Sequence, residues 1–307
     1  MPQNKHQNND SHHVPVLLDE VLECLNPQKG EAYLDLTAGY GGHAGAILEQ
    51  TGNPDETVLV DRDENAVREL KKRFGDTVSI RRQDFLSAAQ ELAGEQERFD
   101  MILADLGVSS PHLNEANRGF ALQLEGPLDM RMDSSQDLRA ETIVNTYKEA
   151  ELADLLWKYG EEPKARQIAR LITGNRPFTT TTELAAVVAR AWPGRSRVHP
   201  ATRTFQALRI AVNDELQLLE HGLPVWLGLL KYGGRIAVIS FHSLEDGIVK
   251  RLLAEAAGDR YDAELKLLTK RPITASPQEL VFNPRARSAK LRAAVKINKE
   301  REASNAY

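Results

Sequence analysis

Residues 33–61 read YLDLTAGYGGHAGAILEQTGNPDETVLVD and decide the fold class of this chain. A short buried strand is predicted at 32–37, and a second strand at 57–60 ends in Asp61. Between them, a glycine-rich turn that begins at Gly39 leads into an apolar helix. Glycines let the backbone turn sharply and approach a ligand closely. A carboxylate at the tip of the second strand can accept hydrogen bonds from both ribose hydroxyls. The stretch therefore predicts a mononucleotide pocket for an NAD-like dinucleotide or S-adenosylmethionine (SAM).

The glycine spacing alone does not choose between these two ligands. Gly39 and Gly41, with Asp61 about 20 residues later, match the loose dinucleotide fingerprint, which also tolerates Ala44 at its third glycine position. SAM is favoured because it has no pyrophosphate that would need a third glycine. A plain strand–turn–helix without a ligand remains the alternative that these residues leave open.

Composition and length restrict the class of protein. A chain of 307 residues with 41% hydrophobic residues can form one large globular domain or two ordinary ones. The polar segment 1–12 predicts a disordered tail without a signal sequence. The single cysteine, Cys24, cannot form an internal disulfide, and no apolar run reaches the roughly 20 residues of a membrane span. We expect a cytoplasmic protein that is not bound to a membrane.

The order of predicted elements indicates an α/β protein. A parallel sheet is expected because strands alternate with helices in the first third of the chain. The predicted strands are 32–37, 57–61, 78–83, 99–105, 233–240, 264–269 and 289–298. Residues 111–205 show little strand signal and predict a helical insertion, followed by one long helix at 201–221 and a second segment at 223–231.

Candidate site residues follow the predicted strands. Parallel sheets bind ligands at the carboxyl ends of their strands. Asp61 follows the second strand, Asp84 and Phe85 follow the third, and Asp105 follows the fourth. We expect Asp61 to hold a ribose, Asp84 and Phe85 to bracket an adenine, and Asp105 to lie near the reacting group.

Phe241 and His242 follow the fifth predicted strand and could line an acceptor pocket. An alternative interpretation is a helix cap with Ser243 at the N-cap position. No histidine or cysteine cluster has the spacing of a zinc site, so no metal is expected. Cys24 lies among apolar residues, and a buried structural thiol is favoured over a covalent nucleophile.

The net charge of −5 excludes a uniformly basic surface, but basic residues cluster in two stretches. Such clusters can follow a polyphosphate backbone even when the total charge is negative. The RNA-contact candidates are Arg195, Arg197, Arg203, Arg285 and Arg287. A solvated helix face and a basic tail explain the same clusters without a nucleic acid.

Long ordered motifs give the chain a resemblance to the bacterial 16S rRNA cytosine-N4 methyltransferase family, also called RsmH or MraW. The matching segments run nearly from end to end. They are 13–20, 41–43, 105–111, 118–120, 126–133, 159–161, 199–210, 233–235, 241–246 and 283–288.

The resemblance implies a class I SAM-dependent methyltransferase fold, with a Rossmann-like, mostly parallel seven-stranded sheet and an inserted all-helical domain. The methyltransferase domain would comprise 13–110 and 206–307, and the substrate-recognition insertion 111–205. The family's SAM contacts fall on Gly41, Gly42, His43, Asp61, Phe85, Asp105 and His112. His112 replaces a glutamine usual in the family, Gly247 replaces an arginine, and Ala121-Leu122 replaces a Ser-Phe pair.

The implied reaction is direct SN2 transfer of the SAM methyl group to N4 of a decoding-centre (P-site) cytidine in 16S rRNA, within the 30S subunit. No covalent enzyme intermediate is expected, Asp105 is the candidate catalytic residue, and the oligomeric state stays open. Three other functions remain as alternatives. They are a non-catalytic SAM-binding ribosome-assembly module, a nicotinamide oxidoreductase, and a methyltransferase acting on DNA or protein.

Overall fold

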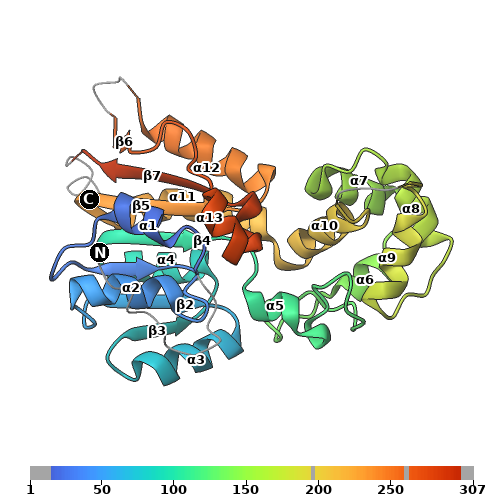
Figure 1. The fold of residues 1–307 in the computed structure, drawn as a ribbon, viewed down its shortest axis with the longest axis horizontal. Coiled ribbons are helices and arrows are strands. Elements are labelled where there is room, and N and C mark those ends of the chain that lie inside the picture. Colours follow the sequence, from blue (N-terminus) through green and yellow to red (C-terminus); the bar gives the residue numbers. More distant parts are fainter. Residues whose placement is uncertain (1–14, 195–197, 259–262, 299–307) are drawn as a thin grey trace.

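The computed structural model describes residues 15–194, 198–258 and 263–298. Seven strands form one sheet in the order β3-β2-β1-β4-β5-β7-β6 (Figure 1). They are β1 (Tyr33–Asp35), β2 (Thr57–Asp61), β3 (Ser79–Arg82), β4 (Phe99–Asp105), β5 (Leu230–Ser240), β6 (Leu265–Leu267) and β7 (Lys290–Lys296). The pairs from β3 to β5 are parallel, and β7 runs antiparallel to both of its neighbours. The predicted α/β class with a mostly parallel seven-stranded sheet is confirmed.

Helices cover both faces of the sheet. These are α1 (Leu18–Leu25), α2 (Gly42–Thr51), α3 (Glu64–Phe74), α4 (Phe85–Gly94), α11 (Glu215–Leu229) and α12 (Ser243–Ala256). Successive residues of β2 belong to two separate hydrophobic cores, one on each face of the sheet. Val58 and Val60 pack in one core, and Leu59 packs in the other. Burial on both faces explains why the strands read as continuous apolar runs.

A second lobe consists of helices with a core of their own (Figure 1). Its helices are α6 (Ala140–Thr146), α7 (Glu149–Gly160), α8 (Ala165–Thr173), α9 (Thr181–Ala189) and α10 (Thr202–Asn213). The core extends from Phe120 to Val212, so the whole of α10 packs with this lobe. We therefore propose the boundary between the lobes at Asp214 rather than between 205 and 206.

The predicted single helix over 201–221 is wrong. The chain breaks at Asp214, which has a left-handed φ of 51° and lies between α10 and α11. The second predicted segment at 223–231 instead covers the latter part of α11, which continues through Pro224 to Leu229, and the first two residues of β5. The proline does not end α11, although its missing N–H removes one helical hydrogen bond.

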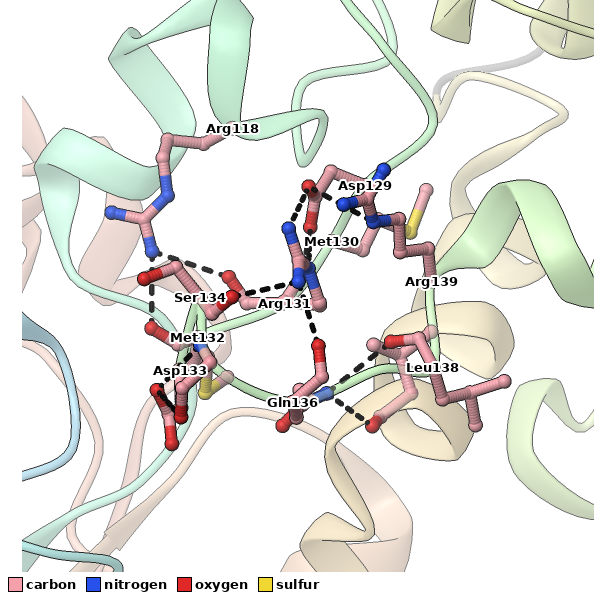
Figure 2. A network of polar contacts seen from close by, with 12 residues as sticks. Arg118, Asp129, Met130, Arg131, Met132, Asp133, Ser134, Gln136, Leu138 and Arg139 are labelled. Atoms are coloured by element: carbon pink, nitrogen blue, oxygen red, sulfur yellow. Dashed lines mark hydrogen bonds and ion pairs between the residues drawn. The ribbon is translucent and has the colours of Figure 1, made fainter.

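Residues between the sheet and the helical lobe form the short helix α5 (Ser110–Asn114), the 3-10 turn η1 (Ala116–Arg118) and an irregular loop. Arg131 holds this loop together (Figure 2). Its guanidinium donates hydrogen bonds to both carboxylate oxygens of Asp129, and to the carbonyl oxygens of Ser134 and Gln136. A planar fork of donors of this kind can order a loop that has no regular secondary structure.

A short helix, α13 (Pro277–Phe282), and the 3-10 turn η2 (Pro284–Ser288) precede β7. In the part of the chain that the structure describes, no helix combines the length and apolar character of a membrane span. The predicted tail at 1–12, Arg195 and Arg197 lie outside the described residues.

Candidate functional site

A cavity of about 1020 Å³ lies at the carboxyl ends of the parallel strands. At least one lining residue lies at the carboxyl end of each of the five parallel strands. In the order of the strands in the sheet, Phe85 follows β3, Asp61 ends β2, Gly39 follows β1, Asp105 ends β4 and Phe241 follows β5. The sheet topology therefore arranges these residues in a row, which suits an elongated ligand lying across the strand ends.

Asp61 connects the end of β2 to the glycine turn. Its Oδ2 accepts a hydrogen bond from the Gly39 N–H at 2.8 Å, and its Oδ1 accepts one from the Asp63 N–H at 2.8 Å. Burial raises the pKa of Asp61, although these two backbone donors act in the opposite direction. The carboxylate is thus held in one orientation at the middle of the row.

The paired glycines of the turn pack mainly against protein. Gly41 has a left-handed φ of 77°, and a Cβ there would lie 2.6 Å from Cε2 of Phe74. A Cβ on Gly42 would lie 2.6 Å from Cγ of Pro15. Gly42 lines the cavity, whereas Gly41 is not among the lining residues. Gly41, a predicted cofactor residue, therefore supports the conformation of the turn on the side that packs against Phe74.

Asp105, at the end of β4, has a buried carboxyl group whose hydrogen bonding is incomplete. Its N–H donates to Thr37 Oγ1 at 2.6 Å, but its buried Oδ1 has no hydrogen-bond partner. Burial raises the pKa of Asp105 well above its usual range, and the nearby charges of Asp35 and Glu245 raise it further. A cation bound beside Asp105 would favour the ionised carboxylate, because opposite charge lowers a carboxyl pKa.

His43 lies beside Asp105 and is oriented by the backbone. Its Nε2 is 2.9 Å from the carbonyl oxygen of Val16, to which it donates in the corresponding tautomer. Its Nδ1 lies 3.9 Å from Asp105 Oδ2. Both side chains line the cavity, as the predicted cofactor role requires.

His112 also lines the cavity, but both of its ring nitrogens contact protein groups. Nε2 lies 2.7 Å from Asp63 Oδ2, and Nδ1 lies 3.2 Å from the Ser109 N–H that donates to it. The contact with Asp63 lacks hydrogen-bond geometry, so the buried Nε2 has no hydrogen-bond partner, whereas Nδ1 accepts from Ser109. Its predicted cofactor role stays a prediction.

Asp63 joins the cofactor side of the sheet to the helical lobe, and it was not among the predicted site residues. Its Oδ2 accepts a hydrogen bond from Arg118 Nη1 at 2.9 Å. Arg118 Nη2 in turn donates to the carbonyl oxygens of Arg131 and Met132. Burial alone would raise the pKa of Asp63, but His112 and Arg118 lower it to about 2. In the sequence, Asp63 can be recognised only as a candidate N-cap residue of α3. An N-cap pattern predicts the start of a helix and does not predict a contact with another lobe.

Phe241 and His242 take different places at the end of β5. Phe241 lines the cavity, whereas His242 is not among the lining residues. His242 is the N-cap of α12, and its Nδ1 accepts a hydrogen bond from the Glu245 N–H at 3.4 Å. The predicted cap at Ser243 is therefore wrong by one residue.

Buried Glu215 and Glu245 and partly buried His242 form a cluster whose potential ligand atoms lie within 4.8 Å of one another. No sequence spacing indicates this cluster, because tertiary packing brings α11 and α12 together. Arg209 supplies positive charge here: it donates two hydrogen bonds to the Glu215 carboxylate at 2.9 and 2.8 Å, and its Nη2 lies 3.8 Å from Glu245.

At the β3 end, Asp84 is the N-cap of α4 and accepts hydrogen bonds from the Leu86 and Ser87 N–H groups. The Phe85 ring meets Trp226 edge-on, with 5.3 Å between ring centroids. Asp84 lines the first cavity and also a second cavity of about 760 Å³.

Cys24 lies on α1 and is not among the residues that line the first cavity. Burial raises the pKa of its thiol.

The described arginine candidates take three different positions. Arg203 is exposed on α10 and donates to the carbonyl oxygen of Glu161 at 2.8 Å. Arg285 lines the cavity and donates to Asn114 Oδ1 at 2.8 Å. Arg287 is exposed on η2. The structure thus brings Arg285 to the cavity, whereas Arg203 and Arg287 are exposed and are not among its lining residues.

The sequence pattern of the MraW methylase family matches residues 10–297. The chain belongs to this family. Two relatives carry the name ribosomal RNA small subunit methyltransferase H. The one from Heliobacterium mobile is 46% identical over 309 residues, covering 93% of this chain and 99% of the relative. The one from Synechocystis sp. is 47% identical over 298 residues, covering 94% of each. Membership of the family makes the chain a methyltransferase, and its sheet is that of the class I fold.

Proposed function

We propose that the chain transfers a methyl group from SAM to the exocyclic N4 amine of a decoding-centre cytidine of 16S rRNA, within the 30S subunit in the cytoplasm. The observation that carries the proposal is the row of Phe85, Asp61, Gly39 and Asp105 along one cavity. Family membership and the names of relatives that are nearly half identical support RNA of the small subunit as the substrate.

The residues of the row fit SAM. Asp61 offers an oriented carboxylate for the ribose hydroxyls, and Phe85 offers an aromatic surface for the adenine. Asp105, with an unpartnered buried oxygen, suits the positively charged end of the molecule together with His43. When bound, SAM supplies a methyl group on a sulfonium centre, which is already activated for transfer.

The protein's contribution is to position and activate the acceptor amine. The N4 lone pair of cytosine is delocalised into the ring, so a group that accepts a hydrogen bond from N4–H makes the amine more nucleophilic. Ionised Asp105 can accept this bond, and its raised pKa also suits it to take the proton that N4 loses. Orientation of the two reactants can supply up to about 7–11 kcal/mol. The pocket needs no covalent intermediate, and Cys24 lies outside it.

Methyl transfer to 30S subunits and to free 16S rRNA, followed by mass spectrometry of the decoding region, tests the proposed reaction. We expect one methyl group on N4 of a cytidine only when the protein is added. Methylation at another atom would contradict the proposed specificity. Binding of the subunit without transfer would instead favour a SAM-binding assembly module.

The variant Asp105→Asn tests the role of the candidate catalytic residue. Unchanged affinity for SAM with abolished turnover supports participation in the transfer. Reduced affinity with normal turnover at saturating SAM would show that Asp105 serves cofactor binding alone.

A further inference from the structure

Two neighbouring apolar side chains stand exposed at the end of the short helix α13. On α13, Val281 is 74% exposed and Phe282 is 80% exposed, the largest exposed fractions among the large hydrophobic side chains in the described segments. Phe282 also lines the cavity, together with the following residues Asn283, Pro284 and Arg285. An exposed aromatic ring at a cavity edge is a common feature of binding surfaces.

Residues of α13 that precede Phe282 fix this short helix to the sheet lobe. The Ser276 hydroxyl caps the helix by accepting a hydrogen bond from the Glu279 N–H at 3.1 Å. Glu279 Oε1 accepts a hydrogen bond from the Leu17 N–H at 2.9 Å, and Leu280 packs against the same core as Phe241. Phe282 is therefore presented to solvent from an anchored helix.

The position of α13 places Phe282 at the acceptor side of the cavity. The residues proposed to hold SAM extend from the β3 end to the β4 end. Beyond them lies β5, and α13 belongs to the segment that leads into β7, the next strand of the sheet. Figure 1 shows α13 at the junction between the sheet and the helical lobe. A substrate that approaches from this side meets α13 before it reaches Asp105.

The charge around Phe282 fits a nucleic acid. Arg285, three residues after Phe282, also lines the cavity, and Arg287 is exposed on η2. Lys72 and Arg73 of α3 line the same cavity, where Lys72 pairs with Glu69. Single-stranded RNA is bound by such a combination, because cations contact its phosphates while aromatic rings stack on its unpaired bases. A protein partner would need a broader apolar surface than this pair of side chains offers.

We propose that Phe282 stacks on an unpaired base next to the target nucleotide of the substrate RNA. This inference rests on the proposed function. Stacking would hold the neighbouring base while the target base, extruded from its own stack, enters the cavity. Phe282 is in this sense a positioning residue that acts on the RNA chain and not on the methyl group.

A fluorescein-labelled single-stranded RNA of the decoding region, with 2-aminopurine beside the target cytidine, tests the proposal. We expect Phe282→Ala to raise the Kd for this RNA by about fivefold to a hundredfold, the range for removal of one stacked base. It should also abolish the quenching of 2-aminopurine, whereas Phe282→Trp should retain both. The affinity for S-adenosylhomocysteine should not change. Tyr232→Ala removes an exposed aromatic side chain that does not line the cavity, and it is the matched control.

Salt dependence separates stacking from charge. Phe282→Ala should leave the slope of log Kd against log salt unchanged. Arg285→Ala should instead make the slope shallower, by about 0.7 for each phosphate that the arginine neutralises in the wild-type protein. With 30S subunits as substrate, Phe282→Ala should raise KM more than it lowers kcat.

Unchanged RNA affinity, quenching and KM in Phe282→Ala, with an active wild-type protein, would overturn the inference and leave the proposed function intact. A wild-type dimer that Phe282→Ala dissociates in sedimentation velocity, without a change in RNA affinity, would assign the surface to self-association and also overturn it. A wild-type protein that neither binds nor methylates the RNA would overturn the proposed function itself.

Discussion

In the sheet lobe, the candidate site residues stand at the ends of consecutive strands, where the parallel register places them. In the helical lobe and its junction, residues 118–139 are held by side chains that hydrogen-bond to backbone carbonyl groups (Figure 2). A strand end is fixed by many backbone hydrogen bonds, whereas the junction depends on a few buried groups. The sheet lobe should therefore tolerate single substitutions in its site without unfolding, and the junction should not.

Arg118→Ala should give the largest effect on stability. The substitution leaves buried Asp63 without its guanidinium partner and also frees the carbonyl groups of Arg131 and Met132. Removal of one member of a buried ion pair typically costs about 3–5 kcal/mol. Urea unfolding should show a decrease of this size in the free energy of unfolding. Arg139→Ala, whose side chain lies at 4.0 Å from Asp129 and is half exposed, should change stability by less than about 0.5 kcal/mol.

The double variant Asp63→Asn with Arg118→Ala sharpens this test. Because the buried charge that has lost its guanidinium partner is then absent, the double variant should be more stable than Arg118→Ala alone. Equal stability of the two would show that the packing of Arg118 and its hydrogen bonds to carbonyl groups account for the effect.

Asp61→Asn should weaken the cofactor site while the fold persists. An amide has only one acceptor oxygen, so it cannot accept from Gly39 and Asp63 and also serve a ribose. Removal of a hydrogen bond to a charged group, at about 1.5–3 kcal/mol, corresponds to a roughly tenfold to hundredfold higher Kd for S-adenosylhomocysteine. Calorimetry measures this directly. An unchanged Kd would remove Asp61 from the proposed site, and RNA affinity serves as the control because it should not change.

The sequence predicts the sheet lobe well because the relevant signals are local. The strands 57–61 and 99–105 coincide with β2 and β4, and the carboxylates that end them, Asp61 and Asp105, both line one cavity. An apolar run followed by a carboxylate is visible within a few consecutive residues of the sequence. The parallel topology of the sheet then places these carboxylates side by side.

The junction could not be predicted in this way. Asp63 and Arg118 are 55 residues apart, and no periodicity relates them. The break at Asp214 requires a left-handed conformation, which is uncommon in residues other than glycine. The cluster of Glu215, His242 and Glu245 likewise exists only after α11 packs beside α12.

Binding of S-adenosylhomocysteine should depend on pH through Asp105. Burial, with the charges of Asp35 and Glu245, raises the pKa of Asp105, so the free protein keeps a proton there over a pH range in which the unfolded chain has released it. A ligand ammonium group favours the ionised carboxylate, so binding should expel this proton and affinity should rise with pH by at most about tenfold for each pH unit. Calorimetry in buffers of different ionisation enthalpy counts the proton. Asp105→Asn should abolish this release, and release of the same size in that variant would assign it to another group.

The smallest expected effect concerns the exposed cations of the helical lobe. Arg203 is exposed on α10, so Arg203→Ala should leave stability and cofactor affinity unchanged. If Arg203 contacts a phosphate, RNA affinity should fall a few-fold, and the slope of log Kd against log salt should become shallower by about 0.7. Arg203→Lys should keep most of that slope, because it keeps the charge. Arg170→Ala, on α8 in the same lobe, removes another exposed arginine and should change neither quantity. An equal decrease in RNA affinity in Arg203→Ala and Arg170→Ala would mean that the lobe attracts RNA by its overall charge, and that Arg203 does not bind one particular phosphate.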